Sequence, residues 1–176
     1  MMPTAPLKRR FAALLYELLL VGAVTVLASF AAGAAAMLLN KLSPLPASFA
    51  AILILMGAWW MYFKICWHKK GGTLPMKVWQ IGLTDLSGAR PVPNRLLLRF
   101  MWACVFLVFI PLLAYAALRH WGGIPPKPAF GAALIWWMLP WGFALFHPDR
   151  QFLYDFLSGT RLVDLKTPSK PENPIG

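Results

Sequence analysis

The chain has 176 residues, of which 59% are hydrophobic and 13% are charged, and its formal net charge is +11. Because a soluble domain carries about 25% charged residues, so few polar side chains would not cover the hydrophobic ones in water. The composition therefore excludes a soluble protein, and the length fits one compact domain. Basic residues beside hydrophobic blocks attract anionic headgroups, so we expect a lipid bilayer and not nucleic acid as the partner.

Four hydrophobic blocks are each bounded by charged residues. A helix that crosses the hydrocarbon core needs about 20 residues, with about 17 to 25 tolerated. None of the blocks alternates with the period of two that a membrane β-barrel requires. We therefore predict an all-α membrane protein built as a four-transmembrane-helix bundle. The predicted spans are residues 11–39, 49–66, 97–119 and 129–147.

The orientation of the spans follows from the basic residues, which are in excess on the cytoplasmic side of membrane proteins. Of the 17 lysines and arginines, all but Lys41, Arg119 and Lys127 fall in the two termini or within residues 64–99, from the end of the second span to the start of the third. This distribution predicts an inner (cytoplasmic) membrane protein with both termini in the cytoplasm.

The N-terminal block also has features of a cleavable signal peptide, because basic residues 8–10 precede it and small residues fill positions 28–36. Signal peptides have hydrophobic regions of about 7 to 15 residues. This block is longer and contains Glu17, so we expect it to be retained. Its small residues, spaced four apart, would allow a neighbouring helix to approach closely.

The longest connection, between the second and third spans, predicts a small amphipathic β-hairpin on the cytoplasmic surface. Residues 77–85 alternate weakly, residues 85–88 have turn composition, and residues 89–92 could return as the second strand. Pro93 or Asn94 would begin the third helix, because proline suits the first turn.

The segment after the fourth span predicts a C-terminal amphipathic helix over 148–157 that lies at the membrane interface. Gly159 would end that helix. Residues 160–163 have extended character and could pair with the hairpin. The proline-rich, polar residues 166–176 predict a disordered cytoplasmic tail.

Glu17 is the most informative single residue. A central carboxylate in a span costs about 2.5 to 3.5 kcal/mol on insertion scales, and such residues pair with a cation or line an ion or substrate path. Arg10 lies on the same helical face, about 10 Å away by helical rise, and Arg99 would lie at the same depth. A structural ion pair that locks helices and a role in transport are both consistent with this pattern.

Other candidate chemistry is sparse. His68, His120 and His147 lie near different span ends without the spacing of metal ligands. No nucleophile or phosphate-binding motif is present, so we expect neither an enzyme nor a cofactor or metal site. Pro111 and Pro140 interrupt the third and fourth spans, and we expect them to form fixed kinks.

Three motifs occur in an order and spacing that resemble the RDD family of bacterial membrane proteins, which is named for one arginine and two aspartates. The resemblance covers residues 7–165, and Glu17 stands where the family has its first aspartate. The longer side chain keeps the charge but moves the carboxylate by one methylene. The motifs are Arg10 with Glu17, the turn containing Gly72, Thr73 and Lys77, and Asp155 with Gly159 and Arg161.

The resemblance implies a bacterial membrane domain over residues 7–165 and makes Asp155 a candidate site residue. It implies no settled activity, although transport is suggested and cation/proton exchange is proposed for some members. Our first hypothesis is transport of an ion or small solute, with Glu17 as the exchanging carboxylate, Arg10 or Arg99 as counter-charge and Asp155 as a gate. A small transporter of this kind would form a homo-oligomer or join another membrane protein. The alternative is a structural or accessory subunit that scaffolds other membrane proteins, with the same charges as helix locks.

Overall fold

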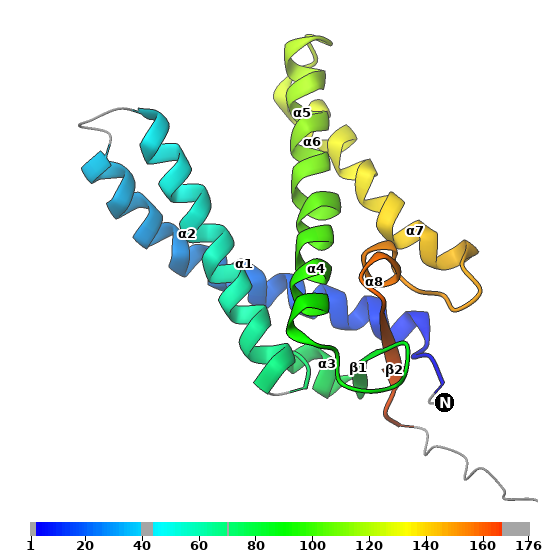
Figure 1. Ribbon diagram of the computed structural model, residues 1–176. Coiled ribbons are helices and arrows are strands. Elements are labelled where there is room, and N and C mark those ends of the chain that lie inside the picture. Colours follow the sequence, from blue (N-terminus) through cyan, green and yellow to red (C-terminus); the bar gives the residue numbers. More distant parts are fainter. Residues whose placement is uncertain (1–2, 40–43, 70, 167–176) are drawn as a thin grey trace, which may run out of the picture. The chain divides into compact units, whose positions relative to one another are not determined.

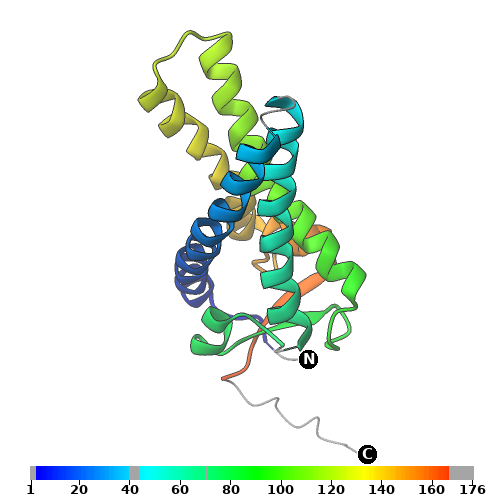
Figure 2. The same cartoon turned by 90° about the vertical axis from the view of Figure 1, so that its left-hand side faces the viewer.

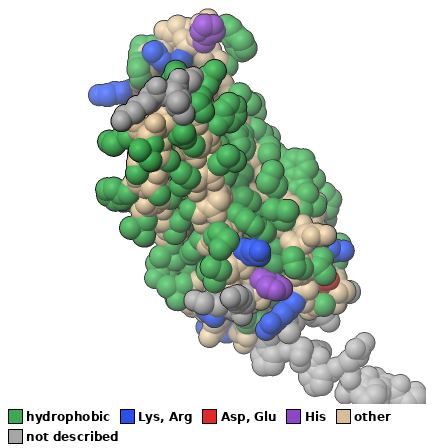
Figure 3. All heavy atoms as spheres, turned by 60° about the vertical axis from the view of Figure 1, so that its left-hand side comes forward, with side chains coloured by type: hydrophobic (Ala, Val, Ile, Leu, Met, Phe, Trp, Pro, Cys, Tyr) green, Lys and Arg blue, Asp and Glu red, His purple; other side chains and the backbone are tan. Residues whose placement is uncertain are grey.

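The computed structural model describes residues 3–39, 44–69 and 71–166 and is mostly helical (Figure 1). Four helices in the described part of the chain are long and apolar enough to cross a membrane, which is the number that the sequence predicts. They are Leu7–Leu39, Pro44–His68, Pro93–His120 and Pro126–Phe146. On the face in Figure 3, hydrophobic side chains cover the helices, and basic and histidine side chains gather toward the ends.

The described residues form two compact units. The first unit, residues 6–81, contains the first two spans, and the second unit contains residues 82–166 together with residues 3–5. Each unit has its own packing and its own polar cluster.

In the first unit, α1 (Leu7–Leu39) and α2 (Pro44–Lys64) lie side by side (Figures 1 and 2). The buried residues of α1 include the small residues Ala13, Ala28 and Ala32, which permit close helix packing. The indole N–H of Trp59 donates to Thr25 Oγ1 at 2.8 Å. The helix α2 begins earlier than predicted, because proline at its first position has no N–H to leave unsatisfied.

The chain after α2 forms a tight turn and not the predicted strand. A π-helical turn covers Ile65–Lys69, and α3 (Leu74–Val78) follows. The side chain of Thr73 caps α3 by accepting from the Met76 N–H, and a proline lies in the first turn, so the local sequence favours a helix. Residues 77 and 78, which the sequence predicts as the start of a strand, therefore belong to a helix.

In the second unit, the third span consists of α4 (Pro93–Cys104), a π-helical turn (Val105–Phe109) and α5 (Ile110–His120). It begins at Pro93, as predicted. Pro111 has no N–H to offer the carbonyl four residues earlier, which belongs to Leu107. The indole N–H of Trp137 donates to that carbonyl at 2.9 Å. Pro111 therefore accounts for the irregular turn, and the hydrogen bond from Trp137 satisfies the carbonyl that the proline leaves without a donor.

The fourth span consists of α6 (Pro126–Leu134), a 3₁₀ turn (Ile135–Trp137) and α7 (Met138–Phe146). Pro140 lies in the first turn of α7, and its ring is incompatible with a regular helical bond to the carbonyl of Trp136. The 3₁₀ turn contains that residue. An irregular turn therefore accompanies each of the two prolines, Pro111 and Pro140.

A two-stranded sheet joins β1 (Ile81–Asp85) to β2 (Thr160–Asp164). The predicted pairing of residues 160–163 with the connection between the second and third spans is confirmed. The predicted hairpin is wrong, because residues 89–92 form no strand. Pro91 removes a ladder donor from that segment. At Gly82, by contrast, an added Cβ would lie 3.0 Å from the Val163 side chain, so glycine permits the close approach of β2.

The N-terminal residues extend this sheet. Thr4 forms an antiparallel bridge with Val163. The Ala5 N–H donates to the Leu162 carbonyl at 3.1 Å, and the Asp164 N–H donates to the Pro3 carbonyl at 2.8 Å. Residues 3–5 therefore hold the segment that ends the described chain.

The C-terminal helix is shorter than predicted. The helix α8 covers Leu153–Leu157 only and ends before Gly159, whose φ of 64° confirms its role as terminator. Its pattern also differs from that of an interfacial helix, because Asp155 is buried and Phe156 is exposed. A buried partner for Asp155, described below, explains the inversion. The predicted tail lies outside the described residues except for Lys166.

The predicted turn at residues 85–88 is present. Oδ1 of Asp85 accepts hydrogen bonds from the Ser87 hydroxyl at 2.6 Å, from the Ser87 N–H at 2.9 Å and from the Ala89 N–H at 3.0 Å. Gly88 has a φ of 86°, which suits a turn. The hydrogen bond from the Ser87 hydroxyl, with those from the two N–H groups, holds the pKa of Asp85 below its ordinary value of 3.8.

This turn should loosen in acid. Because the pKa of Asp85 is depressed in the folded protein, its stabilisation is complete above the ordinary pKa and is lost as the pH falls through the folded value. We expect the amide proton shifts of Ser87 and Ala89, measured by NMR in micelles, to titrate with a midpoint below 3.8. The Asp85→Ala variant should show no such titration; a midpoint at or above the ordinary value would contradict the assignment.

Candidate functional site

Two polar clusters, one in each unit, contain half of the predicted site residues. The Glu17 cluster consists of Glu17, Tyr62 and Thr73 in the first unit. The Asp155 cluster consists of Arg99, Asp155, Ser158 and Thr160 in the second unit.

In the Glu17 cluster, both carboxylate oxygens accept hydrogen bonds from hydroxyl groups. Tyr62 Oη donates to Oε1 at 2.6 Å, and Thr73 Oγ1 donates to Oε2. Glu17 is half-buried, and Thr73 is fully buried. Since hydrogen bonds to a charged acceptor are stronger than neutral ones, the carboxylate holds together α1, α2 and the turn before α3.

The glycine-containing turn explains how Thr73 reaches the carboxylate. Gly71 has a φ of 71°, and the Gly72 N–H donates to the Cys66 carbonyl at 3.0 Å, which closes the end of the second span. Thr73 then uses one hydroxyl twice, as acceptor for the cap of α3 and as donor to Glu17. Of the turn residues that the family resemblance selects, Gly72 and Thr73 are buried and Lys77 is exposed.

Tyr62 is not among the site residues that the sequence predicts. A signal for it exists, because Trp59 and Tyr62 are spaced three apart and therefore lie on neighbouring positions of one face of α2. Each carries a polar group at the tip of an aromatic ring, and each bonds to a polar side chain of α1. Paired polar aromatics within a span thus indicate the face that meets a polar neighbour.

In the Asp155 cluster, Arg99 Nε lies 2.6 Å from Asp155 Oδ1, and the two side chains are 6% and 1% exposed. The guanidinium of Arg99 also lies 5.6 Å from the centre of the Tyr154 ring, within range of a cation–π interaction. Arg99 was one of two predicted counter-charges for Glu17, and the structure pairs it with Asp155.

The hydroxyl groups of Ser158 and Thr160 complete the Asp155 cluster. Ser158 Oγ donates to the Tyr154 carbonyl at 2.8 Å and lies 2.9 Å from Thr160 Oγ1. Thr160 Oγ1 is 3.4 Å from Asp155 Oδ1. Asp155 Oδ2 is buried and accepts no hydrogen bond within the described part of the chain. The ion pair with Arg99 is thus the main compensation for this carboxylate.

A second arginine of α4 binds the same segment. Arg95 Nη1 donates to the Gly159 carbonyl at 3.1 Å. Arg95 and Arg99 are four residues apart and so lie on one face of α4. At Gly159 an added Cβ would lie 3.2 Å from Arg95 Nη1, so glycine serves both the positive φ and the arginine contact.

Arg161 belongs to neither cluster. Arg161 Nη2 is 2.5 Å from Asp149 Oδ2, and these side chains are 20% and 45% exposed. Successive side chains of a strand point to opposite faces, so Thr160 faces Asp155 and Arg161 does not. Arg10, in α1, is 1% exposed. No group of three or more His, Cys, Asp or Glu side chains with metal-binding geometry occurs among residues 3–39, 44–69 and 71–166.

Removing one partner of the buried ion pair should be strongly destabilising. Breaking such a pair costs about 3 to 5 kcal/mol because it leaves an uncompensated buried charge, so we expect Arg99→Met to lower the free energy of unfolding by that amount. Arg161→Met is the matched control, because the partly exposed pair should contribute about 0 to 1 kcal/mol. Reversible unfolding in mixed micelles measures both. Equal losses in the two variants would contradict a special role for the buried pair.

Comparison with known proteins agrees with the motifs. A model of the RDD family matches residues 4–159, a range that includes Arg10, Glu17, Arg99 and Asp155. No match was found among curated proteins or among solved structures. Since the match covers well over half of the sequence, the chain belongs to the RDD family.

Proposed function

We propose that this protein transports an ion or a small solute across the bacterial inner membrane, with Glu17 as the carboxylate that exchanges a proton for a cation. One observation carries the proposal. Within a membrane-spanning helix, the carboxylate of Glu17 meets two hydroxyl groups that come from two other segments of the chain.

The chemistry of this oxygen set fits a proton or an alkali cation. Carboxylate and hydroxyl oxygens are hard ligands, which suit hard cations. The hydroxyl groups of Tyr62 and Thr73 donate to the charged carboxylate, and each oxygen keeps lone pairs that a cation can use. Exchange then converts the protonated carboxyl and a free cation into the carboxylate with a bound cation and a released proton.

The length of α1 bears on access to this group. At about 1.5 Å per residue, a 33-residue helix is about 50 Å long, against about 30 Å for the hydrocarbon core. Glu17 lies about 15 Å from the start of the helix by the same measure. The carboxylate therefore fits the half of the bilayer nearer the N-terminus, within reach of water and ions from that side.

A second candidate function is that of a structural or accessory subunit. The same hydrogen bonds of Glu17 join three segments, and the Arg99–Asp155 pair joins α4 to α8. In that case the polar clusters stabilise a scaffold that binds other membrane proteins. Transport by four spans would itself favour a homo-oligomer or a partner, so an assembly is part of both proposals.

The proposed orientation places both termini in the cytoplasm. Most basic residues flank the proposed inside ends of the spans. The antiparallel bridge between Thr4 and Val163 supports this orientation, because it requires both ends on one side of the bilayer.

Reporter fusions test the orientation. Green fluorescent protein fused to either terminus should fluoresce, and alkaline phosphatase, which is active only outside the cytoplasm, should be inactive there. Phosphatase inserted between Gly122 and Gly123 should be active, since this loop lies between the third and fourth spans. Phosphatase activity at either terminus would reject the proposed orientation.

Ion flux into vesicles tests the transport proposal. The protein in vesicles that contain a pH-sensitive dye should move protons when a Na⁺, K⁺ or Li⁺ gradient is imposed. Glu17→Gln should abolish this flux, and Tyr62→Phe should raise the half-saturating cation concentration about tenfold or more, because hydrogen bonds to charged groups contribute about 1.5 to 3 kcal/mol. Asp149→Asn is the control carboxylate, since its ion pair is partly exposed and lies outside the Glu17 cluster.

The outcomes separate the two functions. Flux no greater than that of empty vesicles, under every cation and pH gradient, would reject transport. Normal flux in Glu17→Gln together with a lower free energy of unfolding would assign Glu17 to the structural role.

A further inference from the structure

A groove in the second unit is lined by residues that belong to neither polar cluster. It has a volume of about 560 Å³ and is lined by α5 and the 3₁₀ turn of the fourth span. This volume falls within the range of about 300 to 1,000 Å³ that is typical of ligand sites. Its lining includes Leu113, Ala114, Ala117 and Trp136. The alanines make the concavity, because their side chains leave space that a larger residue would fill.

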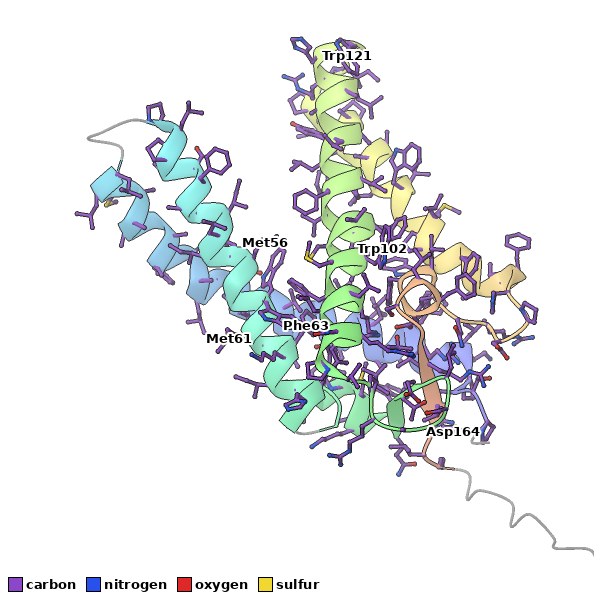
Figure 4. The ribbon with its side chains drawn as sticks, viewed as in Figure 1. Met56, Met61, Phe63, Trp102, Trp121 and Asp164 are labelled. Carbon is purple, nitrogen blue, oxygen red and sulfur yellow. The ribbon has the colours of Figure 1, made fainter. Side chains whose placement is uncertain are left out.

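The residues that line the groove become more polar from one end to the other. Ile110 lies at one end of α5, deep in the third span, and His120 and Trp121 lie at the other. Trp121 is 84% exposed and lies at the tip of α5 (Figure 4). Tryptophan is enriched at the depth of lipid headgroups. One end of the groove therefore lies at the membrane surface, and the rest lies in the hydrocarbon.

Basic side chains lie at the surface end. Arg119 donates from Nη1 to the Ile124 carbonyl at 2.9 Å, which holds its guanidinium beside the loop that follows α5. Lys127 is exposed in the first turn of α6, which packs against α5. An occupant with an apolar chain and an anionic head would match both ends of the groove.

We propose that the groove binds an anionic phospholipid, with one acyl chain along α5 and the headgroup phosphate at Arg119 and Lys127. An acyl chain gains little hydrophobic energy on leaving other lipid chains, because the surroundings are equally apolar. Shape therefore determines whether the chain fits, and the headgroup charge determines which lipid is retained. The site should thus discriminate between headgroups of different charge.

Native mass spectrometry of the full chain in neutral-detergent micelles tests this site. With phosphatidylglycerol or phosphatidylcholine added at equal concentration, we expect about tenfold or more retention of the anionic lipid, since two basic side chains bind its phosphate region. Ala117→Phe should abolish retention by filling the groove. Ala31→Phe, at an exposed position of α1, is the matched control and should retain the lipid.

Charge variants give an independent result if Ala117→Phe does not fold. The double variant Arg119→Gln/Lys127→Gln should lose the preference for phosphatidylglycerol. The control Lys8→Gln/Lys77→Gln removes two exposed charges from the first unit and should keep it. Equal retention of both lipids by the wild type, or retention unchanged by Ala117→Phe, would overturn the proposal. Conversion of a dimer to a monomer by Ala117→Phe, with lipid retention unchanged, would make the groove a contact between two copies.

Discussion

The hydrocarbon core of a bilayer offers no hydrogen-bond partners, so each polar group within a span must find its partner inside the protein. This constraint accounts for the most specific contacts of the chain. Trp59 donates to Thr25, Tyr62 donates to Glu17, and Trp137 donates to the Leu107 carbonyl. Each bond satisfies a group that would otherwise face lipid, and each connects two spanning helices of one unit. The hydrogen bonds that satisfy these polar groups therefore also hold the helices together.

Proline shows how the constraint shapes a helix. Pro111 frees the Leu107 carbonyl, the helix widens into a π-helical turn, and the neighbouring span supplies an indole N–H. A kink of this kind needs its partner at one depth and on one face. The 3₁₀ turn places Trp137 there, so the irregularities of the third and fourth spans depend on each other.

The sequence predicts the features that depend on local chemistry. Hydrophobic length gives the four spans, Pro93 gives the start of the third helix, and Gly159 gives the end of α8. The sequence also predicts that residues 160–163 pair with this part of the chain, but not that β2 takes the place of the strand expected at residues 89–92, because residues 81–85 and 160–164 meet only in the folded unit. The helix predicted over 148–157 fails for a related reason. Its pattern was interpreted as an interfacial face, whereas Asp155 is turned inward by Arg99, a residue far away in sequence.

The same limit applies to the candidate site, and it separates residues that the sequence had grouped together. The transport hypothesis assigned Glu17 and Asp155 to one path, with Arg10 or Arg99 as the counter-charge. Asp155 has an arginine as its close partner and lies in a segment that Arg95 also holds. Glu17 has hydroxyl donors whose hydrogen atoms can reorient when the carboxylate gains or loses a proton. The hydroxyl donors are the reason that the transport proposal places the exchange step at Glu17. The Asp155 cluster instead holds α8, which follows the fourth span, against α4.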